Sequence, residues 1–359
     1  MFIKSLTINN LRNLKTVSIN LHPELNYLLG DNGAGKTSVL ESIVVLAKGR
    51  SFRSGQITSL LGPDSEQFRV VATTIHQDKK QQILGIERSR NEWKARNNGE
   101  DVRQLSDLAS HMPLVLIEPN SHLLVSGPPE GRRRFLDWGV FHVEQGYLVL
   151  WRRYTRALRQ RNAALRKQDK GMVESLDGVL AGLGEKIDQA RRKQQQSLSK
   201  HLVEILSKLS PALAGAKLRY DKGWKGGNLL PALQNALALD MERGATGPGP
   251  HRADLPIYLD KKLAKDRISR GEQKVLSAAL LLSQATLMAE SGEKPILLMD
   301  DLASEFDRSH LNRVLEAARQ LKVQIWITGT SYEPYAGSCD GKHNMFHVEH
   351  GIITTETIT

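Results

Sequence analysis

One short stretch of this sequence carries the residue types of a phosphate-binding loop. Glycines let backbone N–H groups approach phosphate oxygens, and the start of a helix adds positive potential. Lys36 would reach the β- and γ-phosphates of a nucleotide, and the Thr37 hydroxyl would be a ligand of Mg²⁺. The predicted loop consists of Gly30, Asp31, Asn32, Gly33, Ala34, Gly35, Lys36 and Thr37.

A second stretch supplies the carboxylates that such a loop needs. In "ILLMDDLASEFD" the apolar residues 296–299 predict a buried strand, and Asp300 follows at its carboxyl end. There Asp300 can hold Mg²⁺ opposite the loop, while Asp301 can orient or deprotonate an attacking water molecule. An acidic turn after a core strand is the alternative, and the matching loop favours the metal site.

A third stretch, "ISRGEQ", has two interpretations. It resembles the signature motif of the ABC-type ATPases, in which Ser and Gly at a helix N-terminus bind the γ-phosphate of ATP held by the opposite subunit. Ser269 would be the serine of this motif, and "LASEFD" resembles the loop that crosses the same interface. The other interpretation is a capped core helix, with Ser269 as the N-cap and Glu272 or Gln273 in the first turn.

The elements that position these residues alternate between strands and helices. "NYLLG" predicts a strand that ends at the loop, and apolar residues at helical spacing after Thr37 predict a helix. Strands are also expected at residues 16–22, 68–75, 81–88, 113–118 and 323–330.

The middle of the chain has a different pattern. Residues 147–165 and 176–209 carry apolar residues at the 4,3,4 spacing of coiled-coil seams, which predicts a helical hairpin with a turn around residues 169–172. Three glycines, at positions 178, 182 and 184, weaken the second helix.

The fold class that follows is α/β. We expect an ABC-type P-loop ATPase head with mixed sheets and helices, built from both ends of the chain, with an inserted α-helical, coiled-coil-like arm domain. The predicted domains are residues 1–120 for the first part of the head, 121–249 for the arm, and 250–359 for the second part of the head.

Charge is concentrated in the predicted arm. The whole chain of 359 residues has a net charge of +11. Residues 131–210 contain 17 Lys or Arg and 8 Asp or Glu, which is +9. This segment indicates either a polyanionic partner such as nucleic acid or a solvated helical face.

The compartment is also constrained. No apolar run approaches the ~18–20 residues of a membrane span. The lone cysteine, Cys339, excludes an internal disulfide and fits a reducing cytoplasm.

Several segments together resemble a known family. The N-terminal stretch "LTINNLRNLKTVSINLHPELNYLLGDNGAGKTSVLESI" is similar to the RecF/SMC class of ABC ATPases. "GRRRFLDWGVFHVEQGY", "RQRNAALR", "GPHRADL", "ISRGEQK" and "DDLASEFD" resemble RecF proteins in particular, over nearly the whole chain.

The resemblance implies an ATP-dependent DNA-binding protein of recombinational repair and replication-fork maintenance that supports SOS induction. It implies ATP and Mg²⁺ as cofactors, an ATP-dependent homodimer, and no membrane. The implied partners are single-stranded, gapped and duplex DNA, with the mediator proteins RecR and RecO.

The resemblance also assigns roles to residues. Lys36 and Thr37 match the P-loop positions, Asp300 matches the Mg²⁺-associated aspartate, and Ser269 matches the trans-acting serine. Arg12 matches a position that approaches the nucleotide in a related branch of the class.

The chain also departs from the ABC pattern. Asp301 stands where many ABC ATPases have Glu, no clear Q-loop glutamine is present, and "TGT" (residues 328–330) replaces the usual His. These departures suggest slow hydrolysis, a weak ATPase activity stimulated by DNA, and ATP used mainly as a clamp.

Two other classes of protein remain as alternatives. One is another ABC-type ATPase, such as a transporter-associated motor, which the basic hairpin disfavours. The other is a DNA-binding scaffold with a vestigial ATP site, which the complete Mg²⁺ motifs disfavour.

Overall fold

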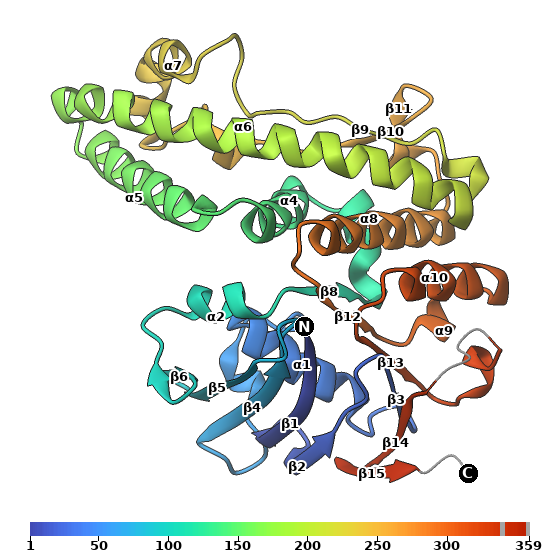
Figure 1. Cartoon of the computed structure of the whole chain (residues 1–359). Helices are drawn as coiled ribbons and strands as arrows, with labels where there is room; N and C mark the ends of the chain where they lie inside the picture. Colours follow the sequence, from blue (N-terminus) through green and yellow to red (C-terminus); the bar gives the residue numbers. More distant parts are fainter. Residues whose placement is uncertain (338–341, 357–359) are drawn as a thin grey trace. The chain divides into compact units, whose positions relative to one another are not determined.

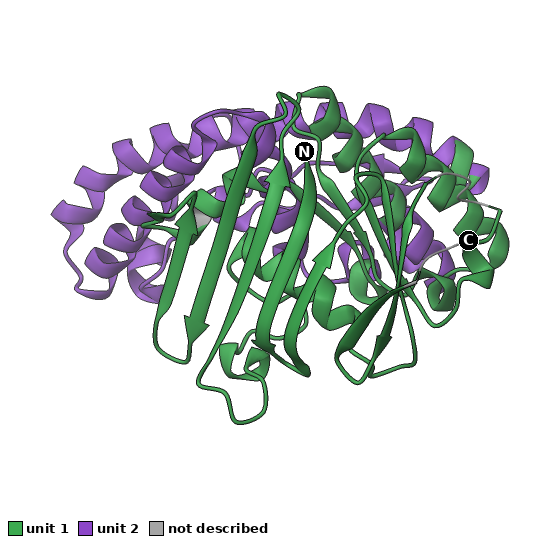
Figure 2. Ribbon diagram, turned by 60° about the horizontal axis from the view of Figure 1, so that its bottom comes forward, with its two compact units in different colours: residues 1–121, 208–210, 278–359 green, residues 122–207, 211–277 purple. Residues whose placement is uncertain are grey.

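A computed structural model describes residues 1–337 and 342–356, so Cys339 lies outside the described residues. The chain forms two compact units, which Figure 2 colours separately. We call them the head unit (Met1–Ser121, Lys208–Ser210 and Ala278–Thr359) and the arm unit (His122–Ser207 and Pro211–Ser277). Residues 250–277 belong to the arm unit in this division, although the sequence interpretation assigned them to the head, and the domain boundaries stay a prediction.

The core of the head unit is a six-stranded sheet in the order β15-β14-β3-β13-β12-β8. Its central strands are parallel, and every residue of β3 (Leu25–Leu29), β12 (Ile296–Met299) and β13 (Ile325–Gly329) is buried. Continuous apolar runs of this kind are typical of parallel sheets covered on both faces. Parallel strands end at the same edge, so residues that follow them meet there.

A second sheet of the head unit is antiparallel, in the order β2-β1-β4-β5-β6-β7. Alternate residues of β4 (Gln67–Ile75) and β5 (Gln81–Ser89) are buried, as expected for a sheet with one packed face. Helix α1 (Lys36–Lys48) packs against β1 (Phe2–Leu11) and β4, which fixes the helix that starts at the phosphate loop.

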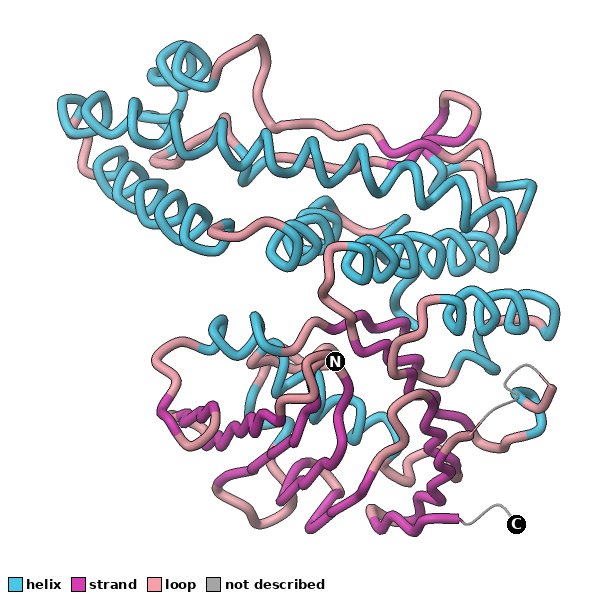
Figure 3. The backbone as a smooth tube through the Cα atoms, in the orientation of Figure 1, coloured by secondary structure: helices cyan, strands magenta, loops and turns pink. Residues whose placement is uncertain are grey.

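Helices dominate the arm unit, as the secondary-structure colours in Figure 3 show. Helix α5 (Tyr147–Arg166) and the 40-residue helix α6 (Lys170–Leu209) form the expected hairpin, and both contribute to one buried cluster with α7 (Leu229–Arg243) (Figure 1). The insertion of long helices into an α/β fold confirms the predicted fold class. Among the residues that the structure describes, no helix is sufficiently long and apolar to cross a membrane.

The remaining elements complete the two units. In the head these are β2 (Leu14–Asn20), β6 (Trp93–Asn97), β7 (Glu100–Asp101), α2 (Leu105–His111), β8 (Leu114–Ile117), α9 (Leu302–Glu305), α10 (Arg308–Gln320), β14 (Asn344–Glu349) and β15 (Ile352–Glu356). In the arm they are α3 (Leu123–Ser126), α4 (Pro129–Val143), β9 (Lys217–Leu218), β10 (Ile257–Leu259) and β11 (Lys262–Leu263), while α8 (Arg270–Glu290) runs from the arm into the head.

One glycine of α6 lies in a crowded position, whereas two do not. A Cβ atom on Gly184 would lie 2.5 Å from Leu229 Cδ2 and 3.3 Å from Pro250 Cδ. A Cβ atom on Gly178 or Gly182 would meet nothing within 4 Å. The helix continues through all three positions because its apolar face is buried, and this packing outweighs the low helix propensity of glycine.

Buried ion pairs hold the arm helices together. The Arg161 guanidinium is fully buried and donates to Asp177 Oδ1 at 2.6 Å, to Asp240 Oδ2 at 2.7 Å and to Thr246 Oγ1 at 2.9 Å. Two carboxylates from α6 and α7 therefore converge on one cation of α5. The cation and the two carboxylates are all removed from water, so each of these buried charges is costly unless its partners are present.

Removing Arg161 should therefore destabilise the arm strongly. We expect Arg161→Met to lower the free energy of unfolding by about 3–5 kcal/mol, since two carboxylates would remain buried without their cation. Denaturant titration followed by circular dichroism measures this loss.

A matched change on the surface provides the control. Arg134 pairs with Glu130 one turn away on α4, and both side chains are more than half exposed. Arg134→Met should change the unfolding free energy by about 1 kcal/mol or less. Equal effects of the two substitutions would contradict the structural role of Arg161.

Candidate nucleotide-binding site

The phosphate loop leaves the carboxyl end of β3 and wraps around the Lys36 ammonium. Lys36 Nζ donates to the carbonyl oxygens of Gly30 at 2.6 Å and Asp31 at 2.9 Å. Burial lowers the pKa of Lys36, and the nearby carboxylates of Asp301, Asp300 and Asp31 oppose that shift. The loop is thus preorganised, with its one cation held at the entrance of α1 where phosphates are attracted.

Two glycines of this loop are required by its surroundings. Gly30 has φ of 150°, and a Cβ atom there would lie 2.1 Å from the carbonyl oxygen of Val348 on β14. Gly35 has φ of 123°, and its Cβ would lie 3.0 Å from Asn13 Nδ2. Asn13 in turn donates to the Ala34 carbonyl at 3.0 Å, so neighbouring chain segments fix the path of the loop.

The predicted metal pair is formed across 263 residues of sequence. Thr37 Oγ1 donates to Asp300 Oδ1 at 3.0 Å. Burial raises the pKa of Asp300, while its hydrogen bonds with Thr328 and Thr37 lower it. A hydroxyl and a carboxylate are the hard oxygen donors that Mg²⁺ prefers, and Mg²⁺ in such sites takes only one or two protein ligands with phosphates and water. The residues present therefore fit Mg²⁺.

A cage made only of protein side chains is not found beside this pair. In residues 1–337 and 342–356, no three His, Cys, Asp or Glu side chains are grouped so that they could hold a metal ion.

Thr328 orients both aspartates and was not predicted as a site residue. From β13 its hydroxyl donates to Asp300 Oδ1 at 2.7 Å and accepts the backbone N–H of Asp301 at 2.9 Å. The hydroxyl of Tyr335 donates to the Thr328 carbonyl at 3.0 Å. In the sequence, "TGT" stands at the end of a predicted strand. This position could have indicated that Thr328 lies at the site.

Asp301 adopts a left-handed backbone conformation, with φ of 50°. This geometry starts α9 directly after β12 and turns the Asp301 side chain to accept a hydrogen bond from Ser304 Oγ at 2.8 Å. Non-glycine residues with positive φ are uncommon, and such strain is often found at functional positions. The role of Asp301 towards water stays a prediction.

Glu118 is a third carboxyl group at this edge of the sheet. It follows β8, whose last residue Ile117 accepts the backbone N–H of Asp300 at 2.9 Å. Burial, followed by the repulsion of Asp300, raises the pKa of Glu118 to about 7. Glu118 was not among the predicted site residues, although its place after an apolar strand resembles that of Asp300.

A short segment after α1 brings another cation to the same edge. Ser51 hydrogen-bonds the buried Glu41 carboxylate and accepts the backbone N–H groups of Arg53 and Ser54, each at 2.9 Å. The Arg53 guanidinium is among the charges that lower the pKa of both Asp300 and Glu118. A positive side chain beside these carboxylates was not expected from the motifs.

Arg12 is fixed from the other side of Glu41. Its Nη2 donates to Glu41 Oε1 at 2.8 Å, and its Nε donates to the second carboxylate oxygen. The hydrogen bond with Glu41 raises the pKa of Arg12, against the effect of burial. Arg12 therefore lies against the helix that begins at the phosphate loop, and its approach to a nucleotide stays a prediction.

Ser269 lies in the arm unit, immediately before α8. Its backbone N–H and its hydroxyl both donate to Glu272 Oε2 at 2.8 Å, and Ser269 Oγ accepts the Glu272 N–H at 3.3 Å. These hydrogen bonds lower the pKa of Glu272. This is the capping box that the sequence pattern allowed, with a serine hydroxyl at the positive end of a 21-residue helix.

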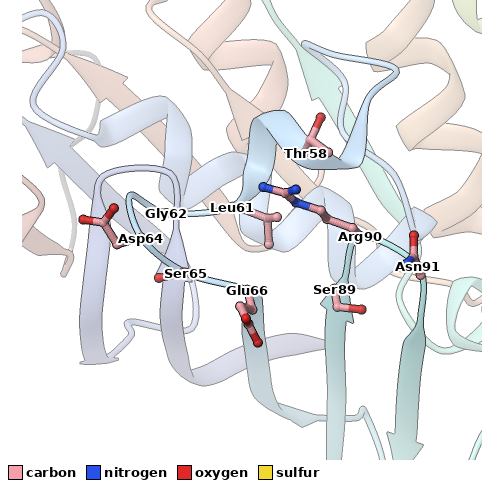
Figure 4. A pocket seen from close by; sticks show the side chains of 9 residues that line it. All are labelled: Thr58, Leu61, Gly62, Asp64, Ser65, Glu66, Ser89, Arg90 and Asn91. Carbon is pink, nitrogen blue, oxygen red and sulfur yellow. The ribbon is translucent and has the colours of Figure 1, made fainter.

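The head unit also has a polar depression of about 580 Å³, shown in Figure 4. Arg90 extends across it toward Leu61. The residues that line it are Thr58, Leu61, Gly62, Asp64, Ser65, Glu66, Ser89, Arg90 and Asn91. None of them belongs to the phosphate loop, although Gly62 lies close to the backbone of Arg12.

The fold and the site together define a P-loop ATPase of the RecF/RecN/SMC class. The family of RecF/RecN/SMC N-terminal domains matches residues 2–354. The chain belongs, within this class, to the RecF family of DNA replication and repair proteins.

Curated relatives support this membership over the full length. The chain is 40% identical to the DNA replication and repair protein RecF of Xanthomonas axonopodis pathovar citri over 367 residues, which is 99% of each chain. It is 41% identical to RecF of Stenotrophomonas maltophilia over 364 residues, covering 98% of this chain and 99% of the relative.

Solved structures agree with the fold. The structure of the recombination mediator protein RecF with ATP, in the RecFOR pathway, has a TM-score of 0.87 at 26% identity, covering 99% of this chain and 98% of that one. The Smc head bound to the C-terminal winged-helix domain of ScpA has a TM-score of 0.59 at 14% identity, covering 100% of this chain and 98% of that one. The latter similarity concerns the fold alone.

The crowded surroundings of Gly30 lead to a stability prediction. Gly30→Ala should destabilise the head by about 3 kcal/mol or more, because the new methyl group collides with the Val348 carbonyl at a backbone angle that alanine also resists. Gly33→Ala is the matched control, since Gly33 has φ of 83° and free space around it.

For Gly33→Ala only the backbone strain of about 1 kcal/mol remains. Thermal unfolding of both variants measures the difference. A Gly30→Ala variant that unfolds at the temperature of the Gly33→Ala variant would contradict the close approach of β14 to the loop.

Proposed function

We propose that this chain binds ATP with Mg²⁺ and uses it to control DNA binding in recombinational repair and in the maintenance of replication forks. The observation that carries the proposal is the pairing of Thr37 with Asp300 beside the closed phosphate loop. RecF with ATP has the same fold at 26% identity, which supports ATP as the nucleotide.

Each site residue has a chemical task in this proposal. Lys36 exchanges its bonds with the loop carbonyls for the β- and γ-phosphates, and the loop N–H groups bind the phosphate oxygens. Thr37 and Asp300 are the protein ligands of Mg²⁺, which would neutralise charge between the phosphates. Thr328 keeps the Asp300 carboxylate in place for that task.

Slow hydrolysis follows from the groups available for activating water. Asp301 is one methylene shorter than glutamate, and its carboxylate is already bonded by Ser304 Oγ. We therefore propose a weak ATPase, stimulated by DNA, in which bound ATP acts mainly as a clamp.

The clamp requires two copies of the chain. In the proposed homodimer the Ser269 hydroxyl leaves Glu272 and donates to the γ-phosphate bound by the partner subunit. The positive end of α8 favours an anion at that place. Two ATP molecules would thus lie between two heads.

The partners follow from charge and from family membership. The basic arm supports binding of single-stranded, gapped and duplex DNA. A relative of the RecFOR pathway supports RecO and RecR as protein partners. We also propose that the protein acts in the cytoplasm and supports SOS induction.

The first test concerns ATP binding. Lys36→Met removes the cation that faces the β- and γ-phosphates, so affinity for ATP should fall at least about 100-fold, equal to about 2.7 kcal/mol. Equilibrium titration with a fluorescent ATP analogue measures the affinity. An unchanged affinity would contradict the assignment of the nucleotide site and would favour the alternative of a DNA-binding scaffold.

The second test separates binding from dimerisation. Ser269→Arg should retain ATP binding by the single chain but abolish ATP-induced dimers, because a bulky cation would occupy the place of the γ-phosphate contact. Light scattering with ATP and Mg²⁺ measures the dimers. Wild-type dimerisation by this variant would mean that Ser269 only caps α8.

Mixing the two variants tests the trans arrangement directly. A pair of one Lys36→Met and one Ser269→Arg chain has one composite site with an intact loop and an intact serine, while the other site carries both defects. Partial recovery of dimers on mixing is expected. No recovery, with each variant folded, would count against a site shared between subunits.

A further inference from the structure

Helix α5 has an unusual distribution of charge. It contains six arginines and no acidic residue over its 20 positions, and Lys167 follows at its C-terminal end. Surface helices normally alternate both signs of charge, since paired charges at i and i+4 stabilise them. An acid-free helix of this length forgoes that stabilisation.

The arginines of α5 are divided between two faces. Arg161 points into the arm, where it is fully buried between Asp177 and Asp240. Arg153, Arg156 and Arg159 are exposed. At 100° per residue these three lie within about 120° of one another, on the side opposite Arg161.

The exposed arginines have no acidic partner. In the part of the chain that the structure describes, no carboxylate forms an ion pair with Arg153, Arg156 or Arg159. Arg159 Nε only contacts the Thr155 carbonyl, at 3.4 Å. With Arg166 and Lys167, also exposed, the cations extend over about 21 Å of the helix.

Three carboxylates of the neighbouring helices are turned inward. Asp177 of α6 and Asp240 of α7 bond Arg161, and Asp137 of α4 bonds the buried Arg191. Other acids of these helices pair with cations of α4 and α6, as in Glu130–Arg134, Lys170–Glu174 and Arg192–Asp188, and none of these pairs includes an exposed arginine of α5, so the outer face of α5 stays positive. Solvation alone requires no such separation, because Lys–Glu pairs would solvate the face equally well.

We infer that the outer face of α5, formed by Arg153, Arg156, Arg159, Arg166 and Lys167, binds the phosphate backbone of DNA. This inference rests on the proposed function and names the surface that carries its DNA binding. Regularly spaced guanidinium groups on a rigid helix suit a polymer of phosphates, because Arg forms paired hydrogen bonds with phosphate oxygens. Contacts with phosphates alone would not depend on base sequence.

The test is a salt series of DNA binding by the full chain. Arg153→Gln, Arg156→Gln and Arg159→Gln are combined in one variant, since Gln and Arg have similar helix propensities. Affinity for a fluorescent duplex is measured by anisotropy between 50 and 200 mM salt with ATP present. Loss of three phosphate contacts should reduce the log–log slope by about 2.7.

A control with the same change in net charge shows whether position matters. Lys79, Lys80 and Lys322 are exposed cations of the head unit, and their combined change to Gln should leave the slope within about 0.5 of the wild-type value. Circular dichroism checks that both variants remain folded.

The outcomes distinguish the inference from the function on which it rests. Wild-type binding with a salt-dependent slope, unchanged in the α5 variant, would overturn the inference and leave this face as a solvated helical surface. Equal slope losses in the α5 variant and the control would overturn it too. No DNA binding by the wild type would instead contradict the proposed function.

Discussion

The parallel order of β3, β13, β12 and β8 is the constraint on which the site depends. Each strand ends at the same edge of the sheet and delivers one group to it: the loop at Gly30, the hydroxyl of Thr328, the carboxylate of Asp300 and the carboxyl group of Glu118. These residues lie up to 298 positions apart in sequence, yet ladder hydrogen bonds fix their separation. At this edge the carboxyl groups of Asp300, Asp301 and Glu118 lie in the field of the cations Lys36, Lys48 and Arg53, which suits a site completed by a divalent cation and phosphates.

Charge is sorted differently in the arm unit. The buried guanidinium groups of Arg161 and Arg191 bind carboxylates of three helices, whereas α5 itself contains no acidic residue and has an outer face of exposed arginines. The same arrangement stabilises the hairpin and shapes its surface potential. A helix bundle that paired its charges on the surface would be equally soluble but would lack this field.

Local patterns made the loop, the proximity of Thr37 and Asp300 and the helical hairpin predictable from sequence, while the metal-binding role of these two residues stays a prediction. Lys36, Thr37 and Asp300 are recognisable because glycine spacing and an apolar strand followed by aspartate are properties of short segments. Thr328, Glu118 and Arg53 were missed because their role depends on which strands are neighbours, a long-range property that no short segment encodes. The three glycines of α6 do not break the helix: only Gly184 lies in a crowded position, next to Leu229, and packing of the apolar face keeps the helix continuous.

In the proposed clamp, ATP links this edge of the sheet to a dimer of the chain. The most direct test is the mass of the unmodified protein in solution, measured by light scattering at one protein concentration with and without ATP and Mg²⁺. We predict a mass near the 40.0 kDa of one chain without nucleotide and about twice that value with ATP. A mass that stays the same while a parallel titration shows ATP bound would contradict the clamp.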